Sequence, residues 1–211
     1  MKRTAFVDKK RPVKGPARAR SGEKVCFPGG TLLAPLPVVL VSCGSGERAN
    51  LITVAWTGIV NTKPPMTYVS IRPERHSYGL IRESGEFIIN LVDERMVRAV
   101  DSCGVRSGRD IDKFEDYGFD RFACEGLECP GVVQSPLSLA CKVRQTLPLG
   151  SHEMFLAEIV GVYADRELLD GAGKLRLDRA ELAAYAHGEY FGLGAKLGTF
   201  GFSVRKKNSI R

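Results

Sequence analysis

The sequence contains few long apolar runs, so we expect neither a membrane-spanning segment nor an export signal within it. None of its apolar runs approaches the roughly 20 residues needed to span a bilayer. The first 20 residues are rich in charge and have no apolar core of the kind found in secretory signals. Apolar residues still make up 44% of the 211-residue chain, which is enough for a sizeable core. We therefore expect a cytoplasmic protein without membrane association, built as one large domain or two small ones.

Recognisable metal sites are also missing. None of the six cysteines forms a Cys-x-x-Cys pair, and the three histidines lie far apart in the sequence. Cys124 and Cys129 are separated by four residues and have no second pair nearby, a spacing that suits neither zinc nor an iron–sulfur cluster. We expect reduced thiols and no metal ion, since disulfides are rare in proteins that are not exported.

Common nucleotide and nucleophile motifs are absent as well. The chain contains no G-x-G-x-x-G, no G-x-x-x-x-G-K-[ST] and no G-x-S-x-G. A Rossmann domain, a P-loop and an α/β-hydrolase nucleophile therefore have no support. No acid–base pair or nucleophile stands out, so we assign no catalytic residue.

The positive charge of the chain is concentrated at its two ends. The formal net charge is +7, yet residues 1–24 alone hold nine Lys and Arg against two acids, and residues 205–211 hold four cations and no acid. We predict a flexible basic arm over 1–24, a single domain over 25–204 and a basic tail over 205–211. Basic ends can bind nucleic acid or an anionic surface. We keep such binding as the rival hypothesis and prefer a solvated arm, because no folded element presents these cations.

Apolar patterns predict a mainly β fold. Alternating or β-branched runs indicate strands over 34–44, 51–60, 65–72, 85–92, 135–149 and 152–168. Helices are predicted over 77–84 and 93–104, the latter capped by Asp93 and stopped at Gly104. The segment 182–202 is expected to be partly helical and then a loop. Because short turns join most strands, we predict an antiparallel, Greek-key-like barrel with short capping helices.

Three polar clusters lie in or beside the apolar strands, and each taken alone also fits a solvated loop or strand surface. Together they suit a phosphate monoester, which needs a hydroxyl, backbone N–H groups at a helix start and one or two cations. Ser77 at the start of a predicted helix supplies the first two. The clusters are Asn50, Thr53, Trp56 and Thr57; Arg72, Arg75 and Ser77; and Ser107, Arg109 and Lys113.

Five stretches carry a resemblance to a known family. They are "NLITVAWTG", "YVSIRPERHSYGLI", "GEFIINLV", "CGVRSGRDIDKF" and "YFGLGAKLGTFGF", which follow in order between about Gly30 and Phe202. In these stretches the chain resembles the flavin reductase-like FMN-binding family, in particular its flavoredoxin-type members. The resemblance implies an antiparallel split β-barrel, a homodimer, and FMN bound non-covalently near the dimer interface.

The resemblance also assigns individual positions. Asn50 and Trp56 stand where the family contacts the flavin after the second strand, with Thr53 and Thr57 beside them. Ser77 stands at the hydroxyl position that binds the phosphate. The resemblance thus implies that residues of the first two polar clusters contact one FMN.

Further positions complete the implied site. Lys113 stands at the phosphate-side lysine, and His152 matches a histidine that reaches the flavin in flavoredoxin-like proteins. The backbone N–H groups of residues 69–72 are expected to face the edge of the flavin ring. Four more side chains are expected in the same site: Ser70, Arg72, Ser107 and Arg109.

A C-terminal aromatic residue also contacts FMN in this family. Tyr185, Tyr190 and Phe191 can each fill that place, and we assign Tyr190. The cofactor would carry the electron chemistry, which explains why no acid–base pair is found.

The sequence thus predicts an FMN-dependent oxidoreductase that transfers hydride or electrons, with NAD(P)H or a redox protein as electron donor. The first alternative is a flavoredoxin-type electron carrier between protein partners, without its own NAD(P)H reaction. The second is a barrel that has lost its flavin and binds another planar ligand. The set of Asn50, Trp56, Ser77 and Lys113 argues against this second alternative.

Overall fold

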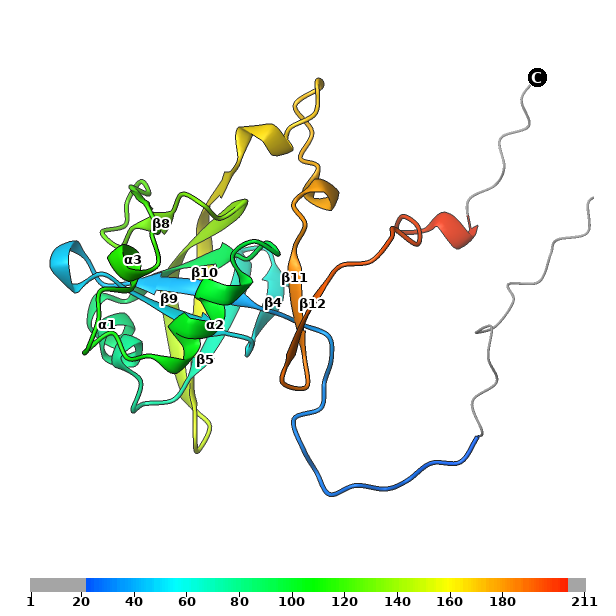
Figure 1. The fold of residues 1–211 in the computed structure, drawn as a ribbon, viewed down its shortest axis with the longest axis horizontal. Coiled ribbons are helices and arrows are strands. Elements are labelled where there is room, and N and C mark those ends of the chain that lie inside the picture. Colours follow the sequence, from blue (N-terminus) through cyan, green and yellow to red (C-terminus); the bar gives the residue numbers. More distant parts are fainter. Residues whose placement is uncertain (1–21, 205–211) are drawn as a thin grey trace, which may run out of the picture. The chain divides into compact units, whose positions relative to one another are not determined.

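The computed structural model describes residues 22–204 (Figure 1). Residues 22–31 have no regular secondary structure, are exposed, and belong to a unit separate from the one that begins at Leu32. The basic tail over 205–211 and nearly all of the basic arm over 1–24 lie outside the described residues. The flexibility of the arm and its binding to nucleic acid therefore stay predictions, as does the domain boundary after residue 24.

The larger unit is organised around one seven-stranded antiparallel sheet with the strand order β3-β2-β6-β9-β10-β5-β4 (Figure 1). The predicted mainly β, antiparallel fold is thereby confirmed. The strands are β2 (Val39–Cys43), β3 (Asn50–Val54), β4 (Thr57–Thr62), β5 (Pro65–Ile71), β6 (Glu86–Leu91), β9 (Leu137–Pro148) and β10 (Glu153–Ala164).

Two smaller sheets complete the strands. One pairs β7 (Arg121–Phe122) with β8 (Gly131–Val132), and the other has the order β1-β11-β12. The bounds of this second sheet are Leu36–Pro37 for β1, Ala183–Ala186 for β11 and Glu189–Gly192 for β12.

The prediction of partial helix over 182–202 is wrong, because β11 and β12 form a hairpin there. His187 and Gly188 both have positive φ, at 51° and 90°. This is the two-residue turn that matches the twist of paired strands, and such a backbone cannot continue a helix. Tyr185 and Tyr190 pair across the hairpin. The small residues around them give little sign of a strand pattern in the sequence.

Three α-helices accompany the main sheet: α1 (His76–Ser84), α2 (Val97–Val105) and α3 (Lys113–Asp116). Single 3-10 turns cover Gly46–Arg48, Arg166–Leu168, Leu177–Arg179 and Phe202–Val204. Helix α2 begins later than predicted, since the Asp93 carboxylate accepts a hydrogen bond from the Met96 N–H in the preceding turn, at 3.0 Å. It also continues through Gly104 to Val105. No helix within residues 22–204 is long and apolar enough to cross a membrane.

Strand β2 places these helices on opposite faces of the sheet, because it is buried on both sides. Its Val39, Val41 and Cys43 join the core under α1, whereas Leu40, together with Val38 just before the strand, joins the core under α2 and α3. The two-residue alternation of a strand produces this division. The start of α1 and the end of α2 are then held on either side of the β2–β3 pair.

The strand predicted over 51–60 is interrupted. Strand β3 pairs with β2 and strand β4 pairs with β5, and Ala55 and Trp56 connect the two. The Trp56 carbonyl accepts a hydrogen bond from the Ser70 N–H at 2.9 Å, while its side chain remains 37% exposed. Because the chain changes its partner strand between β3 and β4, the indole of Trp56 lies partly exposed and not in the core.

Candidate functional site

Two adjoining cavities lie at the ends of β3 and β5, bordered by the start of α1 and the end of α2. Their volumes are about 360 and 350 Å³. They form one elongated site because they share five lining residues: Ile52, Arg72, Arg75, Gly104 and Val105.

Eleven of the twelve expected site residues line these cavities. Thr57 is the exception, since it is buried and its hydroxyl donates to the Tyr68 carbonyl. The first cavity contains Thr53, Trp56, Ser70, Arg72, His152 and Tyr190. The second contains Asn50, Arg72, Ser77, Ser107, Arg109 and Lys113. The structure therefore brings together residues from five separate stretches of the chain.

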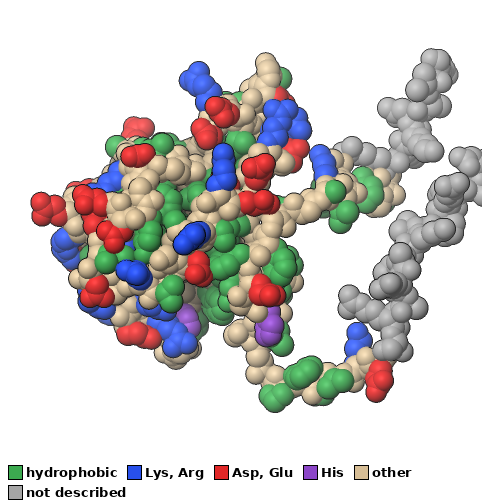
Figure 2. All heavy atoms as spheres, viewed as in Figure 1, with side chains coloured by type: hydrophobic (Ala, Val, Ile, Leu, Met, Phe, Trp, Pro, Cys, Tyr) green, Lys and Arg blue, Asp and Glu red, His purple; other side chains and the backbone are tan. Residues whose placement is uncertain are grey.

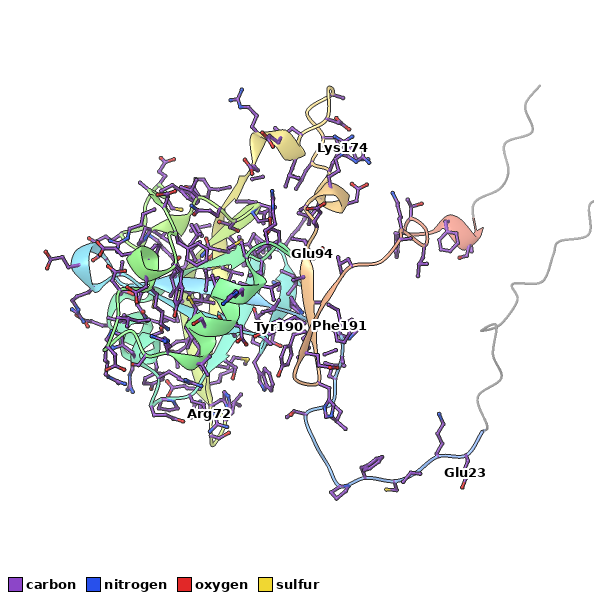
Figure 3. All side chains as sticks on the ribbon, in the orientation of Figure 1. Glu23, Arg72, Glu94, Lys174, Tyr190 and Phe191 are labelled. Atoms are coloured by element: carbon purple, nitrogen blue, oxygen red, sulfur yellow. The ribbon has the colours of Figure 1, made fainter. Side chains whose placement is uncertain are left out.

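The first cavity combines aromatic rings and apolar side chains with the polar groups of Thr53, Ser70, Arg72, Arg75 and Asp101. The rings of Trp56 and His152 are parallel within 4°, with centroids 6.4 Å apart. Tyr185 and Tyr190 meet edge to face at 5.7 Å on the hairpin side (Figure 3 labels Tyr190). Such walls suit a planar ring system with polar atoms along its edge.

A hydrogen bond from α2 fixes the hairpin wall. The Tyr190 hydroxyl donates to the Asp101 carboxylate at 2.9 Å. Burial, together with this carboxylate, raises the pKa of the Tyr190 hydroxyl, so it stays protonated and serves as a donor. Of the three candidate aromatics, Tyr185 and Tyr190 line the cavity, whereas Phe191 does not.

His152 is uncharged at neutral pH. Burial lowers the pKa of its imidazole, and the charge of Arg72 lowers it further. Its Nδ1 lies 3.0 Å from the Ser151 hydroxyl, which leaves Nε2 without a partner among the described residues. The ring can therefore offer a neutral hydrogen-bonding nitrogen.

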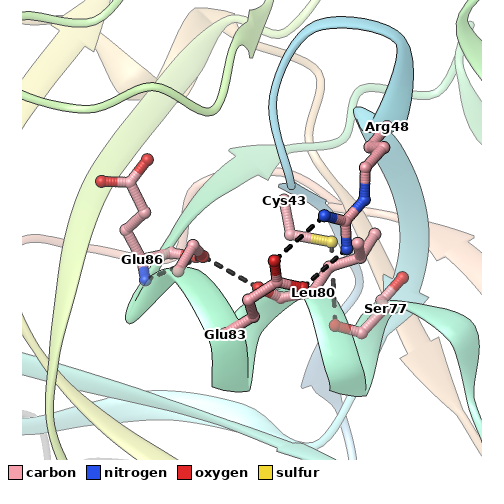
Figure 4. A network of polar contacts seen from close by, with 7 residues as sticks. Cys43, Arg48, Ser77, Leu80, Glu83 and Glu86 are labelled. Carbon is pink, nitrogen blue, oxygen red and sulfur yellow. Dashed lines mark hydrogen bonds and ion pairs between the residues drawn. The ribbon is translucent and has the colours of Figure 1, made fainter.

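The second cavity is built on the start of α1. Ser77 is buried, and its hydroxyl oxygen accepts a hydrogen bond from the Asn50 amide at 2.8 Å. The hydroxyl proton is then available to an acceptor in the cavity. Outside the cavity, Arg48 and Glu83 hold the Gly46–Arg48 turn against α1 through two hydrogen bonds, of 3.0 and 2.6 Å (Figure 4).

The charge of the second cavity is strongly positive. Glu74 is its only acidic lining residue among those described, and it lies 3.6 Å from Arg72. Cations and acids are interspersed on the face drawn in Figure 2, whereas the charged residues that line this cavity are mostly cations. The five cationic side chains are Arg72, Arg75, Arg106, Arg109 and Lys113.

The pKa of His76 reflects this potential. Burial lowers it first, and the charges of Arg109, Lys113 and Arg48 lower it further. A site that resists an added proton in this way favours an anion.

Lys113 has a structural role that the sequence does not reveal. Its buried ammonium donates to the Leu51 carbonyl at 2.8 Å and to the Cys103 carbonyl at 2.7 Å. Leu51 lies on the edge strand β3, and Cys103 lies in the last turn of α2, where carbonyls have no partner in the helix. One of its three N–H donors remains for a ligand.

Close backbone approaches shape the floor of the site. A Cβ atom at Gly108 would lie 2.1 Å from the Asn50 Oδ1, so only glycine fits this contact.

Nearby, burial raises the pKa of the Cys103 thiol to about 11 and that of Cys43 to about 12. Both thiols are protonated at neutral pH, and both pack in the hydrophobic core.

The expected backbone donors of residues 69–72 are mostly occupied. Strand β5 is internal, with β10 on one side and β4 on the other. The Ser70 N–H, for example, donates to the Trp56 carbonyl. Contacts to a ring must come from side chains or from the segments that follow the strands.

Several lining residues were not assigned from the sequence, among them His76, Asp101, Arg106 and Gly108. Asp101 shares the face of α2 that holds Gly104 and Val105, but neither of these was assigned to the site, so helical spacing gave no signal for it. The other three adjoin assigned residues. Neighbours of a predicted binding residue in a loop are themselves candidates.

The flavin reductase-like domain model matches residues 32–194 of the chain. The protein belongs to this family. The match covers both cavities and the whole main sheet.

Solved structures agree with this assignment. The flavoredoxin of Desulfovibrio vulgaris (Miyazaki F) is 29% identical with a TM-score of 0.78, covering 86% of this chain and 99% of that chain. The flavoredoxin of Methanosarcina acetivorans is 27% identical with a TM-score of 0.79, covering 86% and 97%. A Shewanella frigidimarina structure with a split barrel domain is 24% identical with a TM-score of 0.71, covering 80% and 86%. The fold is therefore the predicted split barrel.

Replacing Lys113 by Met should destabilise the ligand-free protein by about 2–4 kcal/mol, because two buried carbonyls lose a charged donor. Urea unfolding monitored by circular dichroism would measure this change. The matched control is Lys174→Met, at an exposed lysine with no side-chain hydrogen bond to the described residues. Equal unfolding midpoints for the two variants would contradict the structural role of Lys113.

Proposed function

We propose that the protein is a flavin-dependent oxidoreductase that binds FMN without a covalent bond. The flavin ring occupies the first cavity and the phosphate occupies the second. The observation that carries this proposal is the continuity of an aromatic cavity with a cationic cavity at the start of α1. Family membership and the likeness to two flavoredoxins support it.

The second cavity fits a phosphate monoester. The Ser77 hydroxyl and the free N–H groups in the first turn of α1 are donors, and Arg109 and the third N–H of Lys113 add charge-assisted donors. Gly108 keeps the loop backbone close to Asn50 and leaves no side chain in the way. One helix start and one buried hydroxyl suit the single phosphate of FMN.

The first cavity would position and shield the ring. Ile52, Val54 and Ile71 supply an apolar floor that excludes water, and Trp56 offers a flat aromatic surface. Neutral His152 offers a hydrogen bond to the ring edge without adding charge. When bound, FMN supplies hydride or electron transfer at its N5 atom.

Mutating the phosphate cavity should weaken FMN binding. Arg109→Gln removes a charged contact, so the dissociation constant should rise about 10- to 100-fold. Ser77→Ala removes a neutral donor and should give a smaller increase. Flavin fluorescence titration measures both effects.

The control for these variants is Arg98→Gln, at an exposed arginine on α2 that lines neither cavity. It removes the same charge at a distance and should leave the dissociation constant unchanged. If Arg109→Gln behaved like this control, the phosphate would not lie in the second cavity.

The electron donor decides between two forms of this function. An NAD(P)H oxidoreductase must accept a nicotinamide beside the ring, whereas a flavoredoxin-type carrier needs only an exposed ring edge. The first cavity, which Trp56 and His152 line, fits both forms, and we propose the oxidoreductase. Anaerobic mixing of the FMN-loaded protein with NADPH or NADH should then bleach the flavin absorbance within seconds. Unchanged absorbance would assign the protein to the carriers.

We also propose a homodimer with FMN near its interface. Exposed apolar side chains gather on β4 and β10, where Ile59, Val60, Val160 and Val162 are all more than 40% exposed. Patches of this kind mark association surfaces. Light scattering should give twice the chain mass of 23.1 kDa, and Val162→Glu should shift the protein towards that single-chain mass. A monomer at all concentrations would exclude the dimer.

A cytoplasmic location is part of the proposal. All six cysteines are free thiols, and five of them are buried. Reduced thiols are the rule in a reducing compartment.

A further inference from the structure

The site holds more positive charge than the phosphate of FMN requires. Five cationic side chains line the two cavities, against the carboxylates of Glu74 and Asp101. A phosphate monoester carries at most about two negative charges at neutral pH. Its binding therefore leaves an uncompensated positive surplus.

Arg75 and Arg106 are the two cations that neither Glu74 nor the proposed phosphate contacts engage. In the proposed FMN complex, Arg109 and Lys113 serve the phosphate, together with Ser77 at the start of α1. Arg75 and Arg106 are exposed, and their guanidinium groups have no hydrogen bond or ion pair to any residue within 22–204. Like-charged groups gathered without partners are destabilising, so they point to an anionic ligand.

Arg75 lies beside both the cavity proposed for the flavin ring and the cavity proposed for the phosphate. Arg75 precedes the first residue of α1 and lines both cavities, so it stands at the junction between the ring and the phosphate. Arg106 follows the last residue of α2 and borders the second cavity from the opposite side. An anion held by both arginines would lie in the second cavity, beside the proposed phosphate of FMN.

We infer that Arg75 and Arg106 form a second anion subsite, which binds the 2′-phosphate of NADPH and makes NADPH preferred over NADH. This inference rests on the proposed FMN site. The 2′-phosphate is the group that distinguishes the two dinucleotides, and it is a dianion suited to paired guanidinium groups. Because both arginines are exposed, the preference is expected to fall as salt is raised.

Binding of the oxidised dinucleotides tests the subsite without any turnover. Protein saturated with FMN is titrated with NADP⁺ and with NAD⁺ by calorimetry, at low salt. NADP⁺ should bind at least about tenfold more tightly than NAD⁺, as expected for a charged contact. Arg75→Gln and Arg106→Gln should each remove most of this difference.

The control is again Arg98→Gln, which changes the net charge equally and should preserve the preference. Equal affinities for NADP⁺ and NAD⁺ in the native protein, or no binding of either, would overturn the inference. So would a preference that persists in both cavity variants. FMN retention is measured separately on each sample, so loss of the subsite and failure of the proposed FMN site give different results.

Discussion

The buried ammonium of Lys113 joins the parts from which the site is made. It connects the edge strand β3, through the Leu51 carbonyl, to the last turn of α2, through the Cys103 carbonyl. Burying a charge is costly unless it is well paired, and here two carbonyl oxygens stabilise the ammonium where the sheet and the helix have unpaired acceptors. The wall between the two cavities depends on this contact, because Gly104 and Val105 directly follow Cys103.

The buried Lys113 ammonium, which holds β3 and α2 together, also contributes to the electrostatics of the site. Burial lowers the pKa of Lys113, and the nearby charge of Arg75 lowers it further. The protein thus holds several like charges close together at the start of α1, where the helix dipole adds to the positive potential. An anionic ligand would relieve this repulsion, so ligand binding and stability should be coupled.

Much of the fold was predictable because its patterns are local. The alternation in β9 and β10 and the turn residues between strands identify an antiparallel sheet without knowledge of tertiary contacts. The break at Trp56 was not predictable, because it arises from the change of partner strand between β3 and β4. The β11–β12 hairpin was missed because alanine and glycine carry little strand signal, although His187 and Gly188 occupy a strand-joining turn.

The candidate site, like the fold, was predictable from the sequence only in part. The polar clusters and the family resemblance predicted twelve site residues, and the fold places eleven of them around two cavities. The sequence did not indicate the side-chain roles that depend on partners far away along the chain. Thr53 donates to the Val100 carbonyl of α2, and Asp101 anchors Tyr190 from the hairpin. Such pairs form only when separate elements pack, so spacing along the chain does not indicate them.

The comparison of FMN with riboflavin tests the central claim most directly, because the two molecules differ only by the phosphate. If the cationic cavity holds that phosphate, FMN should bind at least about 100-fold more tightly, corresponding to two charge-assisted contacts. Raising the salt concentration should reduce this ratio. Equal affinities for FMN and riboflavin would contradict the account, since a ring could then be bound without the second cavity.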